Sequence, residues 1–265
     1  MVAVAEGTFS SGLPYLRLGQ GPPLVMMPGL SPEHANPTGL WRRMYLAGAA
    51  PYAEHFTVTL ANRRAGLAPG STMTDIAADY AEAIENDIGE PVMVHGTSTG
   101  GSVALQLAID RPELVKRLVV ASAACRLSPE GRRMQAELAR LTTEGEVRRA
   151  WGNVTGMLAP GLLRYPAHGL GWLAGRRLAV DDPADMLTTI AAEDSFDAEP
   201  GLQRVQAATL VLGGTADPFY SEDLFRRTAA GVPDGRAVLF PGKGHLYPAT
   251  SQHAVGLSLG FFIAG

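Results

Sequence analysis

The stretch Val92-Met-Val-His-Gly-Thr-Ser98-Thr-Gly-Gly-Ser-Val-Ala-Leu105 decides the fold expected for this chain. It holds the pattern Gly-x-Ser-x-Gly, with an apolar, strand-like run before it and an apolar, helix-like run after it. A serine on such a sharp turn needs a strained backbone and small neighbours, which Gly96 and Gly100 supply. The turn lifts the Ser98 hydroxyl above the sheet and points a helix N-terminus at any negative charge that forms there. Ser98 is therefore the candidate nucleophile.

Two other interpretations of this turn compete with a nucleophile. A glycine-rich turn can simply connect a strand to a helix, and a phosphate-binding loop is also rich in glycine. The phosphate loop requires a Lys after its glycines, and none follows Gly101. The strand before the motif and the helix after it favour the nucleophile, and they make the backbone N–H of Thr99 a candidate oxyanion donor.

Short apolar runs bounded by Gly or Pro recur along the chain and predict strands that are buried on both faces of a sheet. These runs are residues 24–27, 56–60, 91–95, 118–122, 210–212 and 237–240. Helical patterns lie between them; the clearest covers residues 74–88, with Thr74 as its cap and Gly89 after its end. The alternation predicts an α/β fold with a mostly parallel central sheet and helices on both faces.

With these motifs in this order, the chain resembles the α/β-hydrolase fold family, in particular its smaller, capped members. The resemblance covers the whole length outside an insertion in the second half. In that family the catalytic residues follow the chain order Ser, acid, His. The resemblance implies that Asp217, in a turn after the strand at 210–212, is the acid. It likewise implies that His245, after the strand at 237–240, is the base that takes the Ser98 proton.

Several other residues compete for the roles of acid and base. His253 lies inside the helical pattern near the end of the chain, and His95 precedes the elbow as a strand-end residue. Glu222 and Asp223 open a helix, where acidic side chains commonly serve the helix dipole. Asp217 and His245 fit the order and the strand-end positions better than any of these.

The oxyanion hole departs from the family pattern. Members of the family usually carry His-Gly after an early strand, and the next backbone N–H is the second donor. Here Pro28-Gly29-Leu30 stands at that place, so the resemblance implies Leu30 as the donor and leaves the hydrogen bonds around Pro28 open. Thr97 likewise replaces the His that often precedes the nucleophile. The loop continues through His34, which we expect to be solvated.

From about residue 126 to 203 the strand–helix alternation breaks, and the sequence is helical or loop-like. In the family an insertion here forms a helical cap, so we expect a core of residues 1–125 and 204–265 with a cap of residues 126–203. The apolar content of the cap predicts substrate-contacting side chains, although these residues could equally form the cap's own small core. The candidates are Trp151, Met157, Leu158 and Trp172.

Composition excludes several classes of protein. The chain has 265 residues, of which 46% are hydrophobic and 18% charged, and a formal net charge of −4, so nothing indicates a nucleic-acid partner. No apolar run is as long as a membrane span, which needs about 18 residues. The start of the sequence has no basic segment before a hydrophobic stretch, so it does not resemble a signal peptide. A single Cys cannot form an internal disulfide. We therefore expect a cytoplasmic protein without a membrane partner.

We expect neither a metal nor another cofactor. The run Gly169-Leu-Gly171-Trp-Leu-Ala174 matches a dinucleotide fingerprint, but no strand precedes it. No His-Glu-x-x-His or paired Cys-x-x-Cys motif occurs. A group of acidic residues in the insertion is expected to form a solvated face; its members are Asp181, Asp182, Glu193, Asp194 and Asp197.

Taken together, the motifs predict a cofactor-free serine hydrolase acting on a small ester, thioester or lactone with a hydrophobic part, as a monomer or homodimer. A serine at the elbow argues against epoxide hydrolases and haloalkane dehalogenases, because related enzymes of those classes use Asp there. An acyltransferase, cyclase or carbon–carbon bond hydrolase with the same triad stays open. So does a receptor that binds a ligand without catalysis.

Overall fold

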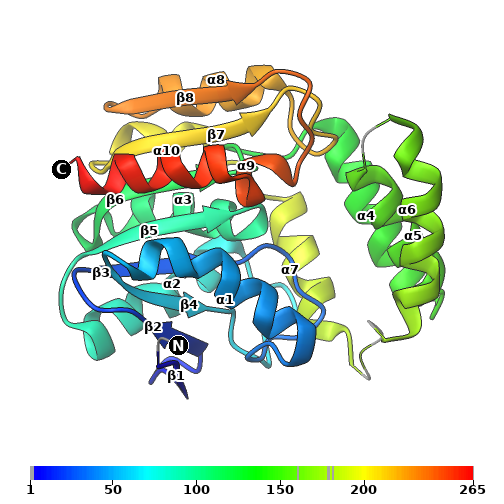
Figure 1. Cartoon of the computed structure of the whole chain (residues 1–265), viewed down its shortest axis with the longest axis horizontal. Helices are drawn as coiled ribbons and strands as arrows, with labels where there is room; N and C mark the ends of the chain where they lie inside the picture. Colours follow the sequence, from blue (N-terminus) through cyan, green and yellow to red (C-terminus); the bar gives the residue numbers. More distant parts are fainter. Residues whose placement is uncertain (1–2, 160, 178–179, 181, 265) are drawn as a thin grey trace.

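A computed structural model describes residues 3–159, 161–177, 180 and 182–264 of the chain (Figure 1). Its centre is one eight-stranded sheet with the strand order β1-β2-β4-β3-β5-β6-β7-β8. Strands β3 to β8 run parallel to one another, and β2 runs antiparallel to both β1 and β4. The strands are β1 Ala5–Thr8, β2 Pro14–Leu18, β3 Pro23–Met27, β4 Thr57–Ala61, β5 Val92–Thr97, β6 Val115–Ala121, β7 Ala208–Gly214 and β8 Gly235–Phe240.

This architecture confirms the predicted fold class, a mostly parallel sheet covered by helices. All six predicted strands are present, from β3 to β8; β3 to β7 are apolar runs that are largely buried in the sheet, and β8 is a half-buried edge strand. The hairpin of β1 and β2 was not predicted. Strand β1 is largely exposed and β2 alternates buried and half-buried side chains, so neither has the continuous apolar run of a central strand.

Helices cover both faces of the sheet. One apolar core cluster joins side chains of α2, α3 and α8 to one face, and a second joins α1 and α10 to the other (Figure 1). The helices are α1 Gly39–Ala53, α2 Met73–Ala83, α3 Thr99–Asp110, α4 Pro129–Thr143, α5 Val147–Leu158, α6 Arg164–Ala174, α7 Ala184–Asp194, α8 Glu222–Gly231, α9 Tyr247–Thr250 and α10 Gln252–Ile263.

The predicted helix at 74–88 is present, but its cap is different. Thr72, and not Thr74, is the N-cap: its side chain accepts a hydrogen bond from the Asp75 N–H, and the Asp75 carboxylate accepts one from the Thr72 N–H in return. This reciprocal pair satisfies two backbone donors at once, which a cap two residues later would not. The helix ends in a π-turn before Gly89, whose φ of 78° suits glycine.

Helices α4 to α7 form the helical insertion, which lies between β6 and β7. Figure 1 shows α4, α5 and α6 standing together beside the sheet, with α7 lying closer to the core. The insertion has a small apolar cluster that includes Leu138, Leu141 and Ile190, and Leu30 from the loop after β3 packs against it. The insertion therefore lies over the carboxyl end of β3. None of the helices in the described ranges is long and apolar enough to cross a membrane.

Candidate active site

The strand-to-helix turn at Ser98 has the strained geometry that the motif predicts. Strand β5 ends at Thr97, and Ser98 has φ 52° and ψ −126° before α3 begins at Thr99. A side chain at Gly100 would place its Cβ 2.2 Å from the Met27 carbonyl oxygen at the end of β3. The turn is thus pressed against the neighbouring strand, which only glycine at this position permits.

The three residues predicted from different loops lie in contact. The Ser98 Oγ is 3.0 Å from His245 Nε2, and His245 Nδ1 is 2.7 Å from Asp217 Oδ2. The Asp217 side chain has no exposed surface, and that of His245 is 8% exposed. When His245 donates its Nδ1–H to the carboxylate, Nε2 is free to accept the serine proton. This arrangement can activate the hydroxyl as a nucleophile.

Neighbouring groups hold the acid and the base in place. Asp217 Oδ1 accepts hydrogen bonds from the backbone N–H groups of Phe219 and Tyr220, at 2.8 and 3.3 Å. The rings of these two residues lie 4.8 and 6.1 Å from the His245 ring, measured between centroids. Ser122, itself at φ 55°, donates its hydroxyl to the His245 carbonyl at 2.5 Å. Both the acid and the base are therefore fixed from two sides.

Residues 28–34, which we call the oxyanion loop because it carries the candidate donor Leu30, pass directly beside Ser98. A Cβ added to Gly29 would lie 3.3 Å from the Ser98 Cβ, so the loop touches the turn at its glycine. In the part of the chain that the structure describes, neither the Leu30 nor the Thr99 N–H donates to a protein acceptor. Thr99 is the first residue of α3 and has no acceptor one turn earlier. Both N–H groups can therefore serve an oxyanion.

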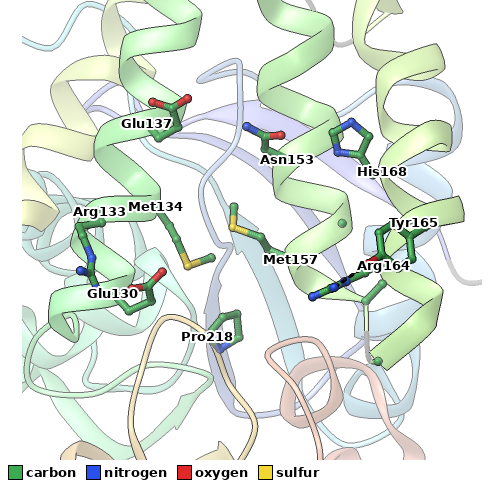
Figure 2. Close-up of a pocket in the computed structure, with 13 residues that line it drawn as sticks. Glu130, Arg133, Met134, Glu137, Asn153, Met157, Arg164, Tyr165, His168 and Pro218 are labelled. Carbon is green, nitrogen blue, oxygen red and sulfur yellow. Dashed lines mark hydrogen bonds and ion pairs between the residues drawn. The ribbon is translucent and has the colours of Figure 1, made fainter.

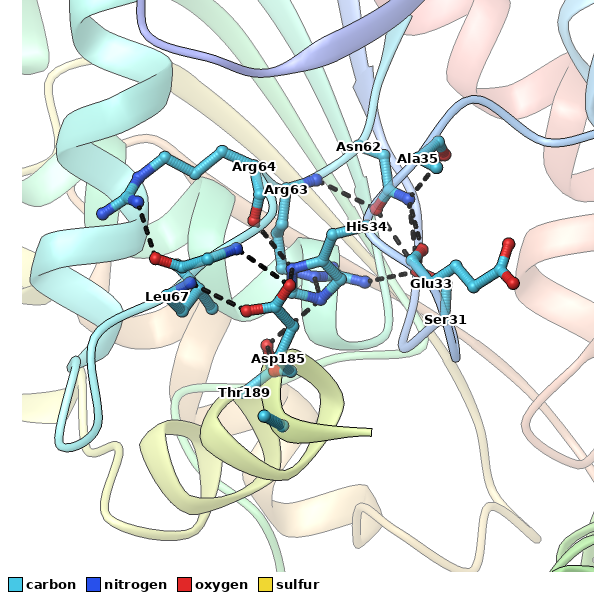
Figure 3. A network of polar contacts seen from close by, with 12 residues as sticks. Ser31, Glu33, His34, Ala35, Asn62, Arg63, Arg64, Leu67, Asp185 and Thr189 are labelled. Atoms are coloured by element: carbon cyan, nitrogen blue, oxygen red, sulfur yellow. Dashed lines mark hydrogen bonds and ion pairs between the residues drawn. The ribbon is translucent and has the colours of Figure 1, made fainter. Parts of the chain in front are cut away.

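Arg63 supplies the hydrogen bonds around Pro28 that the sequence left open. Its Nη1 and Nη2 donate to the carbonyls of Pro28 and Gly29, at 3.2 and 2.8 Å. Figure 3 shows Arg63 in the middle of a polar network that reaches the cap. The hydrogen bonds around Pro28 thus come from a side chain that follows β4, and not from the loop itself.

His34 is not the solvated loop residue that we expected. It is 6% exposed, and its Nδ1 lies 2.9 Å from the Arg64 carbonyl while its Nε2 accepts from Arg63 Nε at 3.3 Å. Burial, together with the nearby Arg63 charge, lowers the pKa of His34 to about 4. The ring is therefore neutral at pH 7 and acts as a structural acceptor (Figure 3).

Glu193 is buried, although we expected it to belong to a solvated acidic face. Asp182, Asp194 and Asp197 are exposed as predicted, and Asp181 lies outside the described residues, but Glu193 is only 1% exposed. Its carboxylate accepts hydrogen bonds of 2.8 to 3.2 Å from four side chains, those of Thr99, Ser102, Gln135 and Tyr220. A cap residue is thus bonded to the first turn of the nucleophile helix and to the residue whose ring flanks His245.

One cluster has the composition of a metal site. Ligand atoms of Cys125, Asp197 and Glu199 lie within 4.8 Å of one another. Arg126 bridges the two carboxylates, at 2.9 and 2.5 Å, and Arg227 adds a further ion pair to Glu199 at 2.5 Å. Arginine side chains therefore already balance the acidic charge here.

Two apolar cavities flank the oxyanion loop. One of about 280 Å³ is lined by Leu30, Trp41, Tyr45 and Trp151, and so lies between the loop, α1 and the cap. The other, of about 220 Å³, also touches Trp41 and is lined by Gly29, Thr97 and Met44 among others. The second cavity reaches Thr97, the residue directly before the candidate nucleophile.

The predicted substrate-contacting residues of the cap are dispersed. Trp151 lines the 280 Å³ cavity, and Met157 lines a larger cleft of about 890 Å³ between α4 and α5 that reaches Pro218, next to Asp217 (Figure 2). The Leu158 carbonyl faces Gly244 beside His245. Trp172 is 42% exposed and packs under the Arg148 guanidinium, 4.5 Å from its ring centroid, so it faces neither cavity at the oxyanion loop.

Sequence reasoning missed Arg63, Glu193 and Tyr220. Arg63 had a usable signal, because it follows β4 at the same edge of the sheet as the loop after β3. Glu193 had none, since it stands among other acidic residues in an amphipathic helix. Tyr220 stands three residues after the acid, close enough to have been suspected as a neighbour of the triad.

Comparisons with known proteins identify the family of the chain. Residues 24–256 match a protein family that is described as "Alpha/beta hydrolase family". The chain is 28% identical over 234 residues to "Putative carbamate hydrolase RutD" of Variovorax paradoxus (strain S110), which covers 82% of this chain and 84% of that one.

Solved structures share the fold across the whole chain. A thermophilic esterase from Thermogutta terrifontis has a TM-score of 0.73 at 20% identity, covering 99% of this chain and 98% of that one. A meta-cleavage product hydrolase from Pseudomonas fluorescens IP01 has a TM-score of 0.76 at 15% identity, covering 98% of both chains. At these identities the likeness concerns the fold.

Proposed function

The chain belongs to the alpha/beta hydrolase family, and on this premise we propose that it is a serine hydrolase that cleaves a small carboxylic ester, thioester or lactone with an apolar part. The observation that carries the proposal is the connected path from Ser98 Oγ through His245 to Asp217, with distances of 3.0 and 2.7 Å. This path supplies an activated nucleophile next to two backbone donors.

The proposed reaction has two stages. Ser98 Oγ attacks the carbonyl carbon as His245 Nε2 takes its proton, and the N–H groups of Leu30 and Thr99 stabilise the oxyanion. His245 then donates that proton to the leaving alcohol or thiol, and an acyl-enzyme remains on Ser98. Water repeats the sequence, with His245 as base, and releases the acid. Asp217 stays ionised throughout and stabilises the charged imidazole.

The cavities support an apolar substrate part of modest size. The 280 Å³ cavity begins at the oxyanion donor Leu30 and has aromatic walls, Trp41, Tyr45 and Trp151. A group bound there removes apolar surface from water while its carbonyl stays near the donors. We therefore place the hydrophobic part of the substrate in this cavity.

Covalent labelling tests the nucleophile. A fluorophosphonate should add one phosphonyl group to the protein, read by intact mass, and peptide mapping should place it on Ser98. Ser98→Ala should abolish both the adduct and aryl-ester turnover. Ser195→Ala, at an exposed serine of the cap, is the matched control and should keep both. The absence of an adduct on the wild-type protein, or an adduct that survives Ser98→Ala, would remove the proposal.

A carbamate is a second candidate substrate, because the RutD relative carries that activity in its name and aligns over 82% of this chain. An aryl carbamate would meet the same nucleophile and donors. Turnover of matched aryl esters and carbamates, with product analysis in the presence of a competing alcohol, separates the substrate classes and shows whether water is the acceptor.

A further inference from the structure

Arg63 is a buried cation that has no acidic partner among the described residues. Its residue has 0% exposure, and within the described ranges no carboxylate lies at ion-pair distance from its guanidinium. The polar network leads from Arg63 through His34 to the carboxylate of Asp185. The Asp185 Oδ2 lies 4.0 Å from His34 Nδ1 and forms no ion pair with Arg63. Burying a charge without an opposite charge is costly, so this arrangement calls for a compensating role.

Within the described residues, every hydrogen-bond acceptor of the Arg63 side chain belongs to the oxyanion loop. Nη1 donates to the Pro28 carbonyl, Nη2 donates to the Gly29 carbonyl and the Ser31 hydroxyl, and Nε donates to His34 Nε2. The shortest of these contacts, at 2.8 Å, is the one to Gly29. The planar, forked guanidinium carries its donors on three nitrogens, so it reaches acceptors spread along the loop that the single nitrogen of an ammonium could not all reach.

The bond to Gly29 acts on the oxyanion donor itself. The Gly29 carbonyl and the Leu30 N–H belong to the same peptide unit. A cation that hydrogen-bonds to the carbonyl polarises the unit, so its N–H becomes a stronger donor. In a buried site the positive charge also stabilises an oxyanion that forms on the far side of the peptide.

The described groups around Arg63 do not neutralise its charge. His34 is a neutral acceptor, and Asp185 of cap helix α7 is occupied by the backbone N–H groups of Gly66 and Leu67, at 3.0 and 2.7 Å (Figure 3). The neighbouring Arg64 turns away and pairs with Asp79 at 2.7 Å. Arg63 is thus the cation of this network that faces the oxyanion loop.

We propose that Arg63 is a positioning residue that shapes the oxyanion loop and electrostatically strengthens the Leu30 donor. The inference rests on the proposed hydrolase function and adds to it a side chain that acts through a peptide bond. Arg63 touches no substrate; its effect appears only when negative charge develops on the carbonyl oxygen. It should therefore influence kcat and leave KM nearly unchanged.

The test compares neutral and charged replacements on an aryl ester. Arg63→Gln should lower kcat about 10- to 100-fold, somewhat less than the loss of a whole oxyanion donor, with little change in KM. Affinity for an aryl trifluoromethyl ketone, whose adduct with Ser98 carries an oxyanion, should fall by the same factor as kcat/KM. Arg63→Lys keeps the charge and should recover part of this loss. Arg64→Gln is the matched control and should behave as wild type.

His34→Glu separates electrostatics from structure and serves even where the Arg63 variants do not fold. A carboxylate beside Arg63 should lower kcat relative to the neutral amide of His34→Gln, which has the same length and can still donate to the Arg64 carbonyl, whereas a purely structural role predicts equal kcat for the two variants. The proposal is overturned when Arg63→Gln and His34→Glu keep kcat within twofold of wild type, or when Lys and Gln at 63 lose kcat equally. A wild-type protein that neither turns over esters nor reacts with fluorophosphonate would instead refute the proposed function.

Discussion

Asp217 combines two tasks in one carboxylate. One oxygen accepts two backbone N–H groups of its own turn, and the other faces His245 Nδ1 at 2.7 Å. The first task shapes the loop, and the second selects the imidazole tautomer. Because the two tasks use different oxygens, a substitution can remove one and keep the other.

Asp217→Asn should leave the fold intact and nearly stop the reaction. The amide oxygen can keep the backbone hydrogen bonds, but the NH₂ group would face His245 Nδ1 and force the proton onto Nε2, which could then no longer accept from Ser98. By analogy with the same change in serine proteases, kcat should fall about 10⁴-fold. Steady-state kinetics beside a urea titration checks this, and a loss of only a few-fold would argue against the assigned acid.

At the scale of secondary-structure elements, hydrogen bonds from α7 connect the insertion to the core at two points. Asp185 near its start binds the backbone at Gly66 and Leu67, and Glu193 near its end binds α3, α4 and the turn after β7. The loop that carries Arg63 and the helix that follows Ser98 are thus both held by one cap helix. The insertion therefore helps to position both of these segments.

Glu193→Leu should destabilise the protein by about 2–4 kcal/mol, because four buried donors lose their acceptor. Glu193→Gln should cost only about 1 kcal/mol. Its carbonyl still accepts, and its NH₂ can donate to Gln135 Oε1, which has no partner among the described residues. Urea unfolding measures both, with Glu82→Leu on the exposed side of α2 as a control expected within about 0.5 kcal/mol of wild type. Equal stability of Glu193→Leu and wild type would contradict this role.

At the scale of the whole molecule, two buried histidines link stability to pH. His95 in β5 is 4% exposed, its ring centroid lies 5.7 Å from that of Tyr52, and burial lowers its pKa from 6.5 to about 4. The pKa of His34 is lowered to a similar value. Both rings are neutral in the folded state and take up protons on unfolding near pH 5. Stability should therefore fall as the pH drops below 6.5.

His95→Leu tests this linkage. Between pH 7 and 5 each histidine should remove about 2 kcal/mol of stability, so the variant should lose about 2 kcal/mol less than wild type over this range. Urea titrations at the two pH values measure the difference, and His253→Gln, at an exposed position, should leave it unchanged. If wild type and His95→Leu lose the same stability, His95 does not titrate on unfolding.

The features that sequence alone predicted are all local. The strands β3 to β8 follow from continuous apolar runs, and the elbow follows from glycine spacing around Ser98. The chain order of Ser98, Asp217 and His245 follows from the family resemblance, and the structure brings these three residues into contact. Each prediction needs only neighbours in sequence or a fixed place relative to a strand end.

Only the tertiary structure decided which polar residues are buried and what they bind. Glu193 looks like any acidic residue of an amphipathic helix, yet its four donors come from positions 99, 102, 135 and 220. His34 and Arg63 likewise owe their burial to the meeting of two loops and a cap helix. A charged side chain is stable inside a protein only when distant segments supply its partners together, and no local pattern records that meeting.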